Sequence, residues 1–509
     1  MRRHLFGVRG LALVAGLAFV VRLVPILIGG GLHSYGRYDD GVYYTGAEAL
    51  TFGRMPYKDF LMLHPPGLLL VLAPFVWIGR LTTDPTGFAV GRVAFMAIGG
   101  LNAVLVAMLA RRWGWVSAVV AGLLYACWMP AVYGEQSTLL EPLGTTATLC
   151  ALLLLCRPGQ PVVTRRAEIF AGVALGLGMT LKIWYAAPFF VVVAWLLVRR
   201  HYAAARRVVV GAVVSATAVL LPFFAFAPDR MLHMVLLDQL ERARRDTSLV
   251  SRLPLLVGVR PLADGHPLEA HIATGVAIVV LGVAAALCLR DRAARLLVAL
   301  LAVNLVVVLA VPTFYMHYSE LTAAPFALVL GIGLTRLRQL PGRVRLARIV
   351  TATVGVAIVV SGLRIVTTPQ GLAFPGATFA AAAPAGCVMS DDPTAMIEMN
   401  RLTTDFKAGC VVPVDVSGIT YDRLHRSGPN GAYLRRAFNP AWQVYLHDYL
   451  FSGTSFVVVR RSGDQVRPPY RAMTKLAPVL ARGDHLVLHS GLDTGAVEVS
   501  GVDAARRSR

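Results

Sequence analysis

The chain has 509 residues, of which 56% are hydrophobic and 15% charged, and its mean hydropathy is +0.63. A soluble globular protein has a lower apolar content and about 25% charged residues, so this composition excludes that class and indicates a polytopic membrane protein. The net charge of +21 does not indicate nucleic-acid binding, because the basic residues fall in short clusters between apolar runs and not on one face.

The first apolar segment, residues 11–30, is long enough to cross the ~30 Å hydrocarbon layer as a helix. A basic N-terminus precedes it, as in a signal peptide, but no small-residue cleavage site of the usual kind follows. We therefore expect an uncleaved first span with the N-terminus in the cytoplasm.

Two adjacent carboxylates, Asp39 and Asp40, follow at the exit of this span. Adjacent carboxylates repel each other, which raises one pKa and produces a usable proton acceptor near neutral pH. The alternative is a solvated loop with an acid that caps a helix. The next apolar segments, 43–52 and 67–79, are too short or too amphipathic to span, and we expect them to be helices at the membrane interface.

Ten further spans follow, which gives about 11 transmembrane helices in all. They lie near residues 88–110, 115–133, 138–156, 167–181, 183–198, 207–226, 271–289, 295–312, 319–335 and 347–366. Arginine clusters such as 111–112, 199–200 and 336–348 all fall on one side of these spans, which assigns that side to the cytoplasm. Acidic, aromatic and histidine side chains gather on the other side, where we expect any chemistry to occur.

The composition changes after residue 369, which predicts two domains: a membrane domain, 1–369, and an extracytoplasmic domain, 370–509. Short apolar runs at 410–414, 455–459 and 485–489 alternate with turn residues, so the second domain is expected to have a small α/β fold.

Two local features of this domain are also predictable. Asp391 and Asp392 precede a helix-forming segment and are expected to cap it rather than to catalyse. Cys387 and Cys410 lie in the same domain and could form a disulfide in an oxidising compartment.

Several motifs together point to one family. They are Asp39-Asp40-Gly41-x-Tyr43, Ala47-Glu48-Ala49-Leu50, Gly53-Arg54-Met55-Pro56-Tyr57-x-Asp59-Phe60, His64-Pro65-Pro66-Gly67, Glu141-Pro142-Leu143, the Gly-rich segment from Gly172 to Lys182, and His317-Tyr318. This series resembles the C-type glycosyltransferases of the protein O-mannosyltransferase and RgtA/B/C/D-like group, over about residues 1–366. The chain has Asp40 where many members carry glutamate, which leaves open which of the two acids is the base.

The resemblance implies an enzyme that moves one sugar from a polyprenyl-phosphate donor to a cell-envelope glycan, a glycolipid or a protein on the outer face of the cell membrane. Such an enzyme needs a base and a cation for the lipid phosphate. Asp39 is the expected catalytic base, with Asp40 as the alternative. The candidates for the donor phosphate are Lys182, Lys58, Arg92, Arg244 and Arg245, and the candidates for substrate binding are Tyr43, Tyr44, His64, Glu141, His317 and Tyr318.

Each of these roles has a plainer alternative. Lys182 could be a snorkelling lysine at a helix end, and the tyrosines could be ordinary anchors at the interface. The segment from Asp229 to His271 carries Arg242, Arg244 and Arg245, an unusual basic density for the outer side that could bind an anionic lipid or simply be solvated.

No HExxH, CxxC or EF-hand spacing is present, so we assign no metal ligand and no certain cofactor, while a divalent metal at His64 and His317 stays open. The competing function is that of a membrane transporter or lipid flippase. Such proteins place ionisable residues at mid-membrane and often have repeated halves, and neither feature is evident in the sequence. The identities of the sugar and of the acceptor cannot be read from it.

Overall fold

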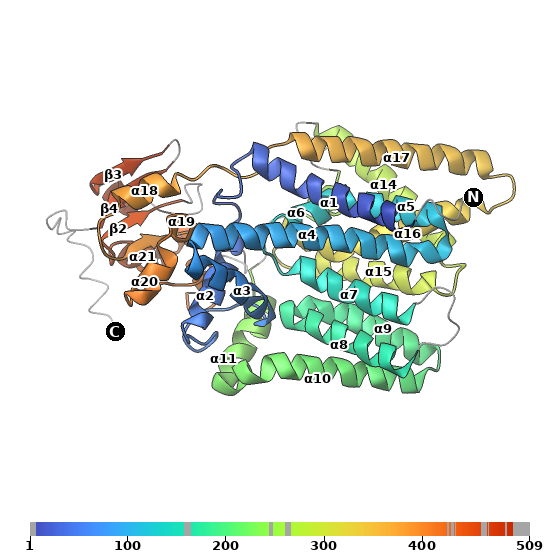
Figure 1. Ribbon diagram of the computed structural model, residues 1–509, viewed down its shortest axis with the longest axis horizontal. Helices are drawn as coiled ribbons and strands as arrows, with labels where there is room; N and C mark the ends of the chain where they lie inside the picture. The colour runs from blue at the N-terminus through green and yellow to red at the C-terminus, as the bar shows by residue number, and fades with distance from the viewer. Residues whose placement is uncertain are drawn as a thin grey trace.

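The computed structural model describes residues 7–156, 164–243, 248–259, 266–424, 427–428, 432, 434–459, 466, 468–483 and 486–491. Its long helices run side by side along the molecule, and a small α/β unit lies at one end (Figure 1). The helical part is therefore a bundle, and the polar segments that join its helices lie at its two ends.

Six helices of the described chain are long and apolar enough to cross a membrane. They are α1 (Val8–Ile28), α4 (Asp84–Ala110), α10 (Tyr202–Phe226), α14 (Pro267–Cys288), α16 (Glu320–Arg338) and α17 (Val344–Thr367). A seventh span results if α5 (Trp115–Ala126) and α6 (Met129–Glu135) are counted together, with a bend of 55° between them. Pro130 in the first turn of α6 fits this break, because proline begins a helix well but cannot continue one.

The bundle is completed by the shorter helices α7 (Glu141–Leu155), α8 (Arg165–Leu181), α9 (Ala186–Val198) and α15 (Ala294–Ala310), while the apolar helix α3 (Gly67–Leu81) belongs to the first loop. Every segment expected to span is helical, but α9 has 13 residues and α7 has 15, which at 1.5 Å per residue fall short of a ~30 Å layer. The polytopic class is thus supported, whereas 11 complete spans are not confirmed.

The remaining helices of this part are short and lie mainly in the connecting segments. They are η1 (Arg111–Trp113), η2 (Ile183–Tyr185), α2 (Tyr38–Thr51), α11 (Pro228–Leu232), the π-helix η3 (His233–Leu237), α12 (Asp238–Leu240), α13 (Leu249–Leu256) and η5 (Met316–Ser319). Both α2 and α3 belong to the first loop, residues 29–83, and correspond to the two helices expected at the interface.

Small residues bring helices close together inside the bundle. A Cβ atom on Gly172 of α8 would lie 2.1 Å from the carbonyl oxygen of Val208 in α10, and one on Gly176 would lie 2.3 Å from that of Ala212. Only glycine permits this backbone approach, which is the usual mode of helix association in membranes. These glycines therefore permit the close packing of α8 against α10.

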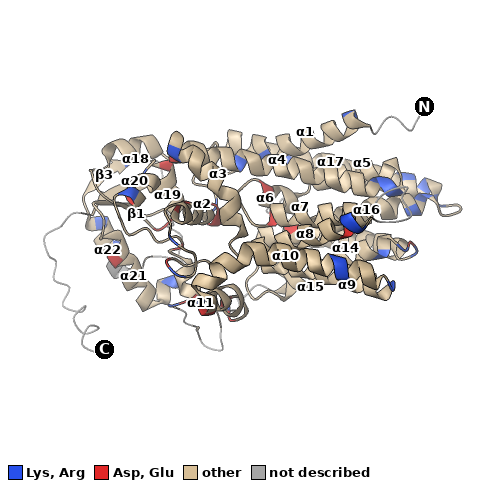
Figure 2. Cartoon of the chain, turned by 60° about the horizontal axis from the view of Figure 1, so that its bottom comes forward, with Lys and Arg blue, Asp and Glu red and all other residues tan. Residues whose placement is uncertain are grey.

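Charged residues are distributed unevenly along the bundle. Lysine and arginine gather at the end opposite the α/β unit (Figure 2). The arginine clusters that were assigned to one side by sequence, including 336–348, lie at this end, and the first loop lies at the other. This separation supports the predicted sidedness, although which end faces the cytoplasm stays a prediction.

The segment after residue 369 forms a small α/β unit, which fits the expected fold class. Its helices are α18 (Gly376–Ala382), α19 (Pro393–Glu398), α20 (Leu402–Lys407), η6 (Gly418–Tyr421), η8 (Arg436–Phe438), α21 (Pro440–Leu450) and α22 (Pro468–Leu476), and its strands are β1 (Val388–Ser390), β2 (Ser455–Val457), β3 (Val479–Arg482) and β4 (Val487–Ser490). The strand order is β1-β2-β4-β3, with β1 parallel to β2 and the other pairs antiparallel.

Two of the three expected strands are present, as β2 and β4. The run 410–414 is not a strand; it contains Pro413, which has no N–H group for a sheet hydrogen bond, and Cys410, which is bonded to Cys387. That disulfide confirms the expected pairing. Asp392 caps α19 as expected, since its side chain accepts a hydrogen bond from Thr394 N at 3.0 Å.

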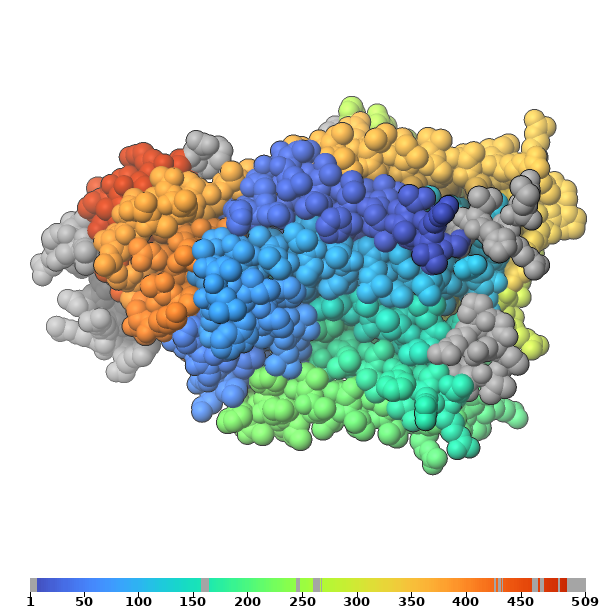
Figure 3. All heavy atoms as spheres, viewed as in Figure 1, coloured from blue at the N-terminus to red at the C-terminus, as the bar shows by residue number. Residues whose placement is uncertain are grey.

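Polar contacts attach the α/β unit to the first part of the chain. The side chain of Asp84, at the start of α4, accepts a hydrogen bond of 3.0 Å from Thr403 N, and its backbone N–H donates to Asn400 Oδ1 at 2.9 Å. The space-filling view shows the unit packed on segments from the first hundred residues (Figure 3). The first loop is thereby held between the bundle and the α/β unit.

Candidate active site

A cavity of about 430 Å³ lies where the first loop, the segment around η5 and the α/β unit meet. It is lined by Gly36, Arg37, Tyr38, Asp39, Val42, Tyr43, Leu61, Met62, Leu63, His64, Tyr133, Leu139, Arg242, Tyr315, His317, Tyr318, Asp415, Ser417, Gly418, Tyr421 and Arg436. The volume is within the range of small-molecule sites, and polar groups line much of the wall. We call it the polar cavity.

The acid pair at the start of α2 has two different environments. Asp39 is half-buried and lines the polar cavity. Asp40 is fully buried: Arg92 Nε donates to its Oδ2 at 2.8 Å, and Thr138 donates to its Oδ1 from its backbone N–H and from its hydroxyl. Consecutive residues of a helix point about 100° apart, which is why neighbouring acids can face a cavity and a protein core.

Four of the other residues expected to bind substrate line the cavity as well, namely Tyr43, His64, His317 and Tyr318. The rings of Tyr43 and His64 meet edge to face at 6.0 Å, as do those of His317 and Tyr318 at 4.6 Å. Burial lowers the pKa of His64 well below its usual value, and the nearby cations Lys182 and Arg242 act in the same direction. His64 is therefore a neutral hydrogen-bonding group at this wall.

Lys182 and Glu141 form a buried ion pair and do not line the cavity. The exposed fraction of Lys182 is 2%, which contradicts the snorkelling alternative. Its ammonium lies 4.1 Å from the ring centroids of both Trp184 and Tyr318, and His317 Nε2 is 3.9 Å from Glu141 Oε1. The pair thus supports the two side chains of η5 that do line the cavity.

This burial leads to a prediction for Lys182→Met. The substitution leaves the carboxylate of Glu141 buried without its cation, and breaking a buried pair in this way typically costs about 3–5 kcal/mol. We expect a clearly lower melting temperature in detergent, measured by intrinsic fluorescence. The double variant Lys182→Met/Glu141→Gln should recover much of the loss, whereas weaker donor binding at an unchanged melting temperature would contradict this supporting role.

Three other expected site residues lie elsewhere. Tyr44 is in the core, where its hydroxyl donates to Phe75 O at 3.3 Å. Arg92 lines a separate cavity of about 220 Å³, and Lys58 is exposed beside Phe226. Arg244 and Arg245 lie outside the described residues.

Arg37, Arg242 and Arg436 line the cavity, and of these Arg242 comes from the basic segment singled out in the sequence. Its Nη1 donates to the hydroxyl of Tyr318 at 3.3 Å, its guanidinium carbon lies 4.6 Å from the ring centroid of Tyr421, and its Nε has no hydrogen-bond partner among the described residues. The basic density of its segment was visible in the sequence, but spacing alone could not distinguish Arg242 from Arg244 and Arg245.

The α/β unit supplies further lining residues that no sequence pattern singles out. Tyr38 donates a hydrogen bond of 2.7 Å to Asp415 Oδ1 and accepts one of 2.7 Å from Ser417 N. The hydroxyls of Tyr315 and Tyr421 are 3.4 Å apart. Asp415, Ser417 and Tyr421 lie beyond the region of family resemblance, and no motif spacing marks them.

A second, mainly apolar groove of about 440 Å³ adjoins this site. Ile183, Trp184, Val235, Leu236, Val307 and Pro312 are among its lining residues. Arg242 and Tyr318 line both the groove and the polar cavity. A cation and a phenol therefore stand at the junction between an apolar and a polar compartment.

A metal at His64 and His317 gains no support. Among the described residues, neither histidine belongs to a group of three or more His, Cys, Asp or Glu side chains with atoms close enough to hold one ion. The polar cavity is lined instead by carboxylates, tyrosines, histidines and arginines.

Comparison with solved structures defines the class. The structure of ArnT from Cupriavidus metallidurans bound to undecaprenyl phosphate is similar, with a TM-score of 0.61 and 17% identity, over 96% of this chain and 99% of ArnT. The structure of ArnT in the apo state has a TM-score of 0.60 and 18% identity, over 95% of this chain and 98% of ArnT. The oligosaccharyltransferase AglB from Archaeoglobus fulgidus, in complex with an inhibitory peptide and a dolichol-phosphate, has a TM-score of 0.55 at 11% identity, covering 88% of this chain and 68% of AglB. The chain thus has the fold of the C-type membrane glycosyltransferases, and the resemblance seen in its sequence is confirmed.

The family model that matches the sequence is that of glycosyltransferase family 87, over residues 62–312. The match includes His64, Glu141, Lys182 and Arg242 and begins after Asp39. No curated protein sequence matches the chain.

Proposed function

We propose that this protein transfers one sugar from a polyprenyl-phosphate carrier to a hydroxyl group of a cell-envelope glycan, glycolipid or protein. The observation that carries the proposal is the junction at Arg242, where the apolar groove meets a polar cavity that contains a carboxylate. A lipid-linked sugar has the same division, with an isoprenoid chain, a phosphate and a sugar in series. The family match and the ArnT-like fold support a membrane glycosyltransferase.

Asp39 is the proposed general base. It accepts the proton of the acceptor hydroxyl while the oxygen attacks the anomeric carbon, and the bond from that carbon to the phosphate oxygen breaks. One such displacement inverts the configuration at the anomeric carbon. Asp40 is not suited to this role, because Arg92 and Thr138 engage both of its oxygens inside the protein.

Arg242 is the proposed ligand of the donor phosphate. Negative charge grows on the leaving phosphate, and a cation fixed beside it stabilises the transition state more than the ground state. The apolar groove next to Arg242 suits the first isoprene units of the carrier. Tyr43, His64 and His317 then remain on the cavity wall to contact the sugar.

The decisive experiment is a donor assay with the purified protein in nanodiscs. Radiolabelled pentosyl and hexosyl polyprenyl phosphates are each incubated with envelope glycan, glycolipid and peptide acceptors, and both the glycosylated product and the released polyprenyl phosphate are measured. The proposal requires covalent transfer that depends on Asp39. Movement of a labelled lipid or sugar across the bilayer without covalent transfer would instead establish the transporter or flippase alternative.

The mechanism requires the cavity to face outward, which gives a topological prediction. In a background without Cys127, Cys150, Cys156 and Cys288, the unpaired cysteines of the described chain, single cysteines near Thr82 and Ser427 should react with an impermeant thiol reagent in whole cells. One near Arg343, at the arginine-rich end, should react only after permeabilisation. The reverse pattern would overturn the sidedness and, with it, the proposed use of an outer-face acceptor.

A further inference from the structure

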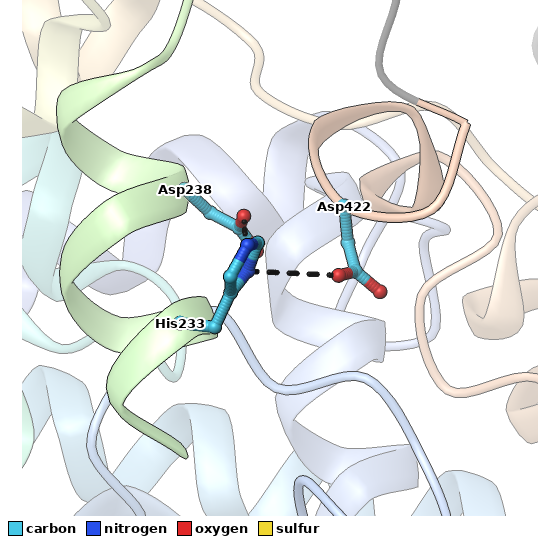
Figure 4. Close-up of side chains that lie close together, drawn as sticks. All are labelled: His233, Asp238 and Asp422. Atoms are coloured by element: carbon cyan, nitrogen blue, oxygen red, sulfur yellow. Dashed lines mark ion pairs between the residues drawn. The ribbon is translucent and has the colours of Figure 1, made fainter. Parts of the chain in front are cut away.

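Three potential metal ligands meet outside the polar cavity, at a contact between the helical part and the α/β unit (Figure 4). They are His233 and Asp238, which follow α10, and Asp422, which follows η6. Their ligand atoms lie within 4.8 Å of one another, and none of the three lines the cavity.

Local backbone structure brings the first two ligands together. Residues five apart in an α-helix point about 140° away from each other, so His233 and Asp238 would diverge in a regular helix. Here His233–Leu237 is a π-helical turn, whose wider winding returns the chain to the same side after five residues. Such turns are rare in proteins, and many of those that occur lie at functional sites. The turn therefore has an identifiable result, which is the pairing of these two side chains.

The hydrogen bonding of the cluster is incomplete. Asp238 is 2% exposed, and its Oδ2 has no hydrogen-bond partner among the described residues. The side chain of Asp422 is also 2% exposed, and Arg230 Nη2 contacts its Oδ2 at 2.8 Å. Two buried carboxylates that face each other are costly without a cation between them. Arg230, and Arg423 with its Nε at 3.7 Å, compensate Oδ2 of Asp422 and leave the unpartnered oxygen of Asp238 unsatisfied.

We propose that His233, Asp238 and Asp422 bind a divalent cation, with Zn²⁺ as the best match to one imidazole nitrogen and two carboxylates. Two ligands of a tetrahedral zinc, each about 2.0–2.2 Å from the ion, lie about 3.4 Å apart. The separations of His233 Nδ1 from Asp238 Oδ1 and from Asp422 Oδ1 are 2.9 and 4.0 Å, which bracket this value. Arg230 orients Asp422 from behind, as outer-shell partners of metal ligands do. The half-exposed ring of His233 leaves the ion a path to solvent and room for water as a further ligand.

The ion fixes two walls of the polar cavity relative to each other. The segment that carries Asp238 continues to Gln239, which donates to Leu63 O at 2.7 Å, and to Arg242. Asp422 directly follows Tyr421, which lies under the guanidinium of Arg242. Zinc at the cluster would thus hold the α/β unit on the helical part next to the site, in a structural role and not as part of the chemistry.

The test measures bound metal in the full-length purified protein and needs no substrate, so its outcome does not depend on the proposed transferase activity. After incubation with zinc chloride and gel filtration, elemental analysis should find about one equivalent of zinc per chain in the wild type and its loss in His233→Ala and Asp238→Asn. His266→Ala is the matched control, because His266 is an exposed histidine near Glu269, and it should retain the metal.

A second measurement covers variants that fold poorly. Chelation should lower the melting temperature of the wild-type protein by several degrees, and zinc should restore it. The chelator should have little effect on Asp238→Asn. Two results would overturn the proposal: a zinc content in the wild type no higher than in Asp238→Asn, or a wild-type melting temperature that neither chelator nor zinc changes. The three residues would then be an ion-pair cluster around Arg230.

Discussion

Asp39→Asn is expected to lower turnover by at least the ~10²-fold that loss of a general base costs, while the melting temperature and membrane insertion stay unchanged. The substitution keeps the size of the side chain but removes the group that accepts the proton. Asp39 is half-buried at the cavity wall, so its replacement leaves the core of the protein intact. Product formation under single-turnover conditions, with donor in excess over its Kd, measures the chemical step.

Asp40→Asn is the matched comparison and should have the opposite profile. It removes the charged partner of the buried Arg92, so we expect a lower melting temperature and a smaller direct loss of turnover. Asp415→Asn should also reduce turnover less, because Oδ1 of Asp415 is already engaged by Tyr38 and Gly418. Near-normal turnover in Asp39→Asn together with an inactive Asp40→Asn would transfer the role of base to Asp40.

Arg242→Met is expected to weaken donor binding and to lower turnover, with a combined loss in kcat/KM of about 10²-fold or more. Methionine keeps an unbranched apolar side chain but removes the positive charge that lies between the apolar groove and the polar cavity. The decrease in kcat should be larger than for the loss of a residue that only binds the donor, because the negative charge on the phosphate grows as its bond to the sugar breaks. Arg242→Lys should recover part of the activity, since it keeps the charge without the planar guanidinium.

The control for Arg242 is Lys58→Met, which removes one positive charge from an exposed side chain that does not line the cavity. Its kinetics and donor affinity should match the wild type. Equal losses in both variants would point to a general electrostatic attraction of the anionic donor, which added salt would screen. Unchanged donor affinity in Arg242→Met would exclude the proposed phosphate site.

Many features of the fold were predictable because they depend on properties that are local in sequence. Long apolar runs form helices in a membrane since every backbone N–H and C=O group must be paired inside the segment. Local patterns of apolar and turn residues predicted the helical segments of the bundle, the two helices of the first loop and the α/β character of the region after residue 369. The length of each helix was harder to predict, because helices such as α7 and α9 end where packing and connections require, short of a full span.

Motifs named Asp39, Tyr43, His64, His317 and Tyr318, which line one cavity, but motif spacing does not give the orientation of a side chain. Asp39 and Asp40 are the same residue type, so the sequence alone does not distinguish them. Their consecutive positions in α2 direct the carboxylate of Asp39 toward the polar cavity and that of Asp40 toward Arg92. Lys182 was a reasonable phosphate ligand by sequence, yet it lies beside Glu141, 41 residues away. No local pattern encodes such a partner.

The sequence by itself indicated a polytopic membrane protein that resembles the C-type glycosyltransferases, with arginine clustered on one side of the spans and the acid pair in the first loop. Hydropathy, charge clusters and motif order are properties of neighbouring residues, and that is why they could be read directly. Tertiary structure decided which groups share one cavity: Asp39 from the first loop, Arg242 from the segment after α10, His317 from η5, and Tyr421 from the α/β unit. These groups come from segments up to several hundred residues apart, and the packing of the α/β unit against the bundle brings them together.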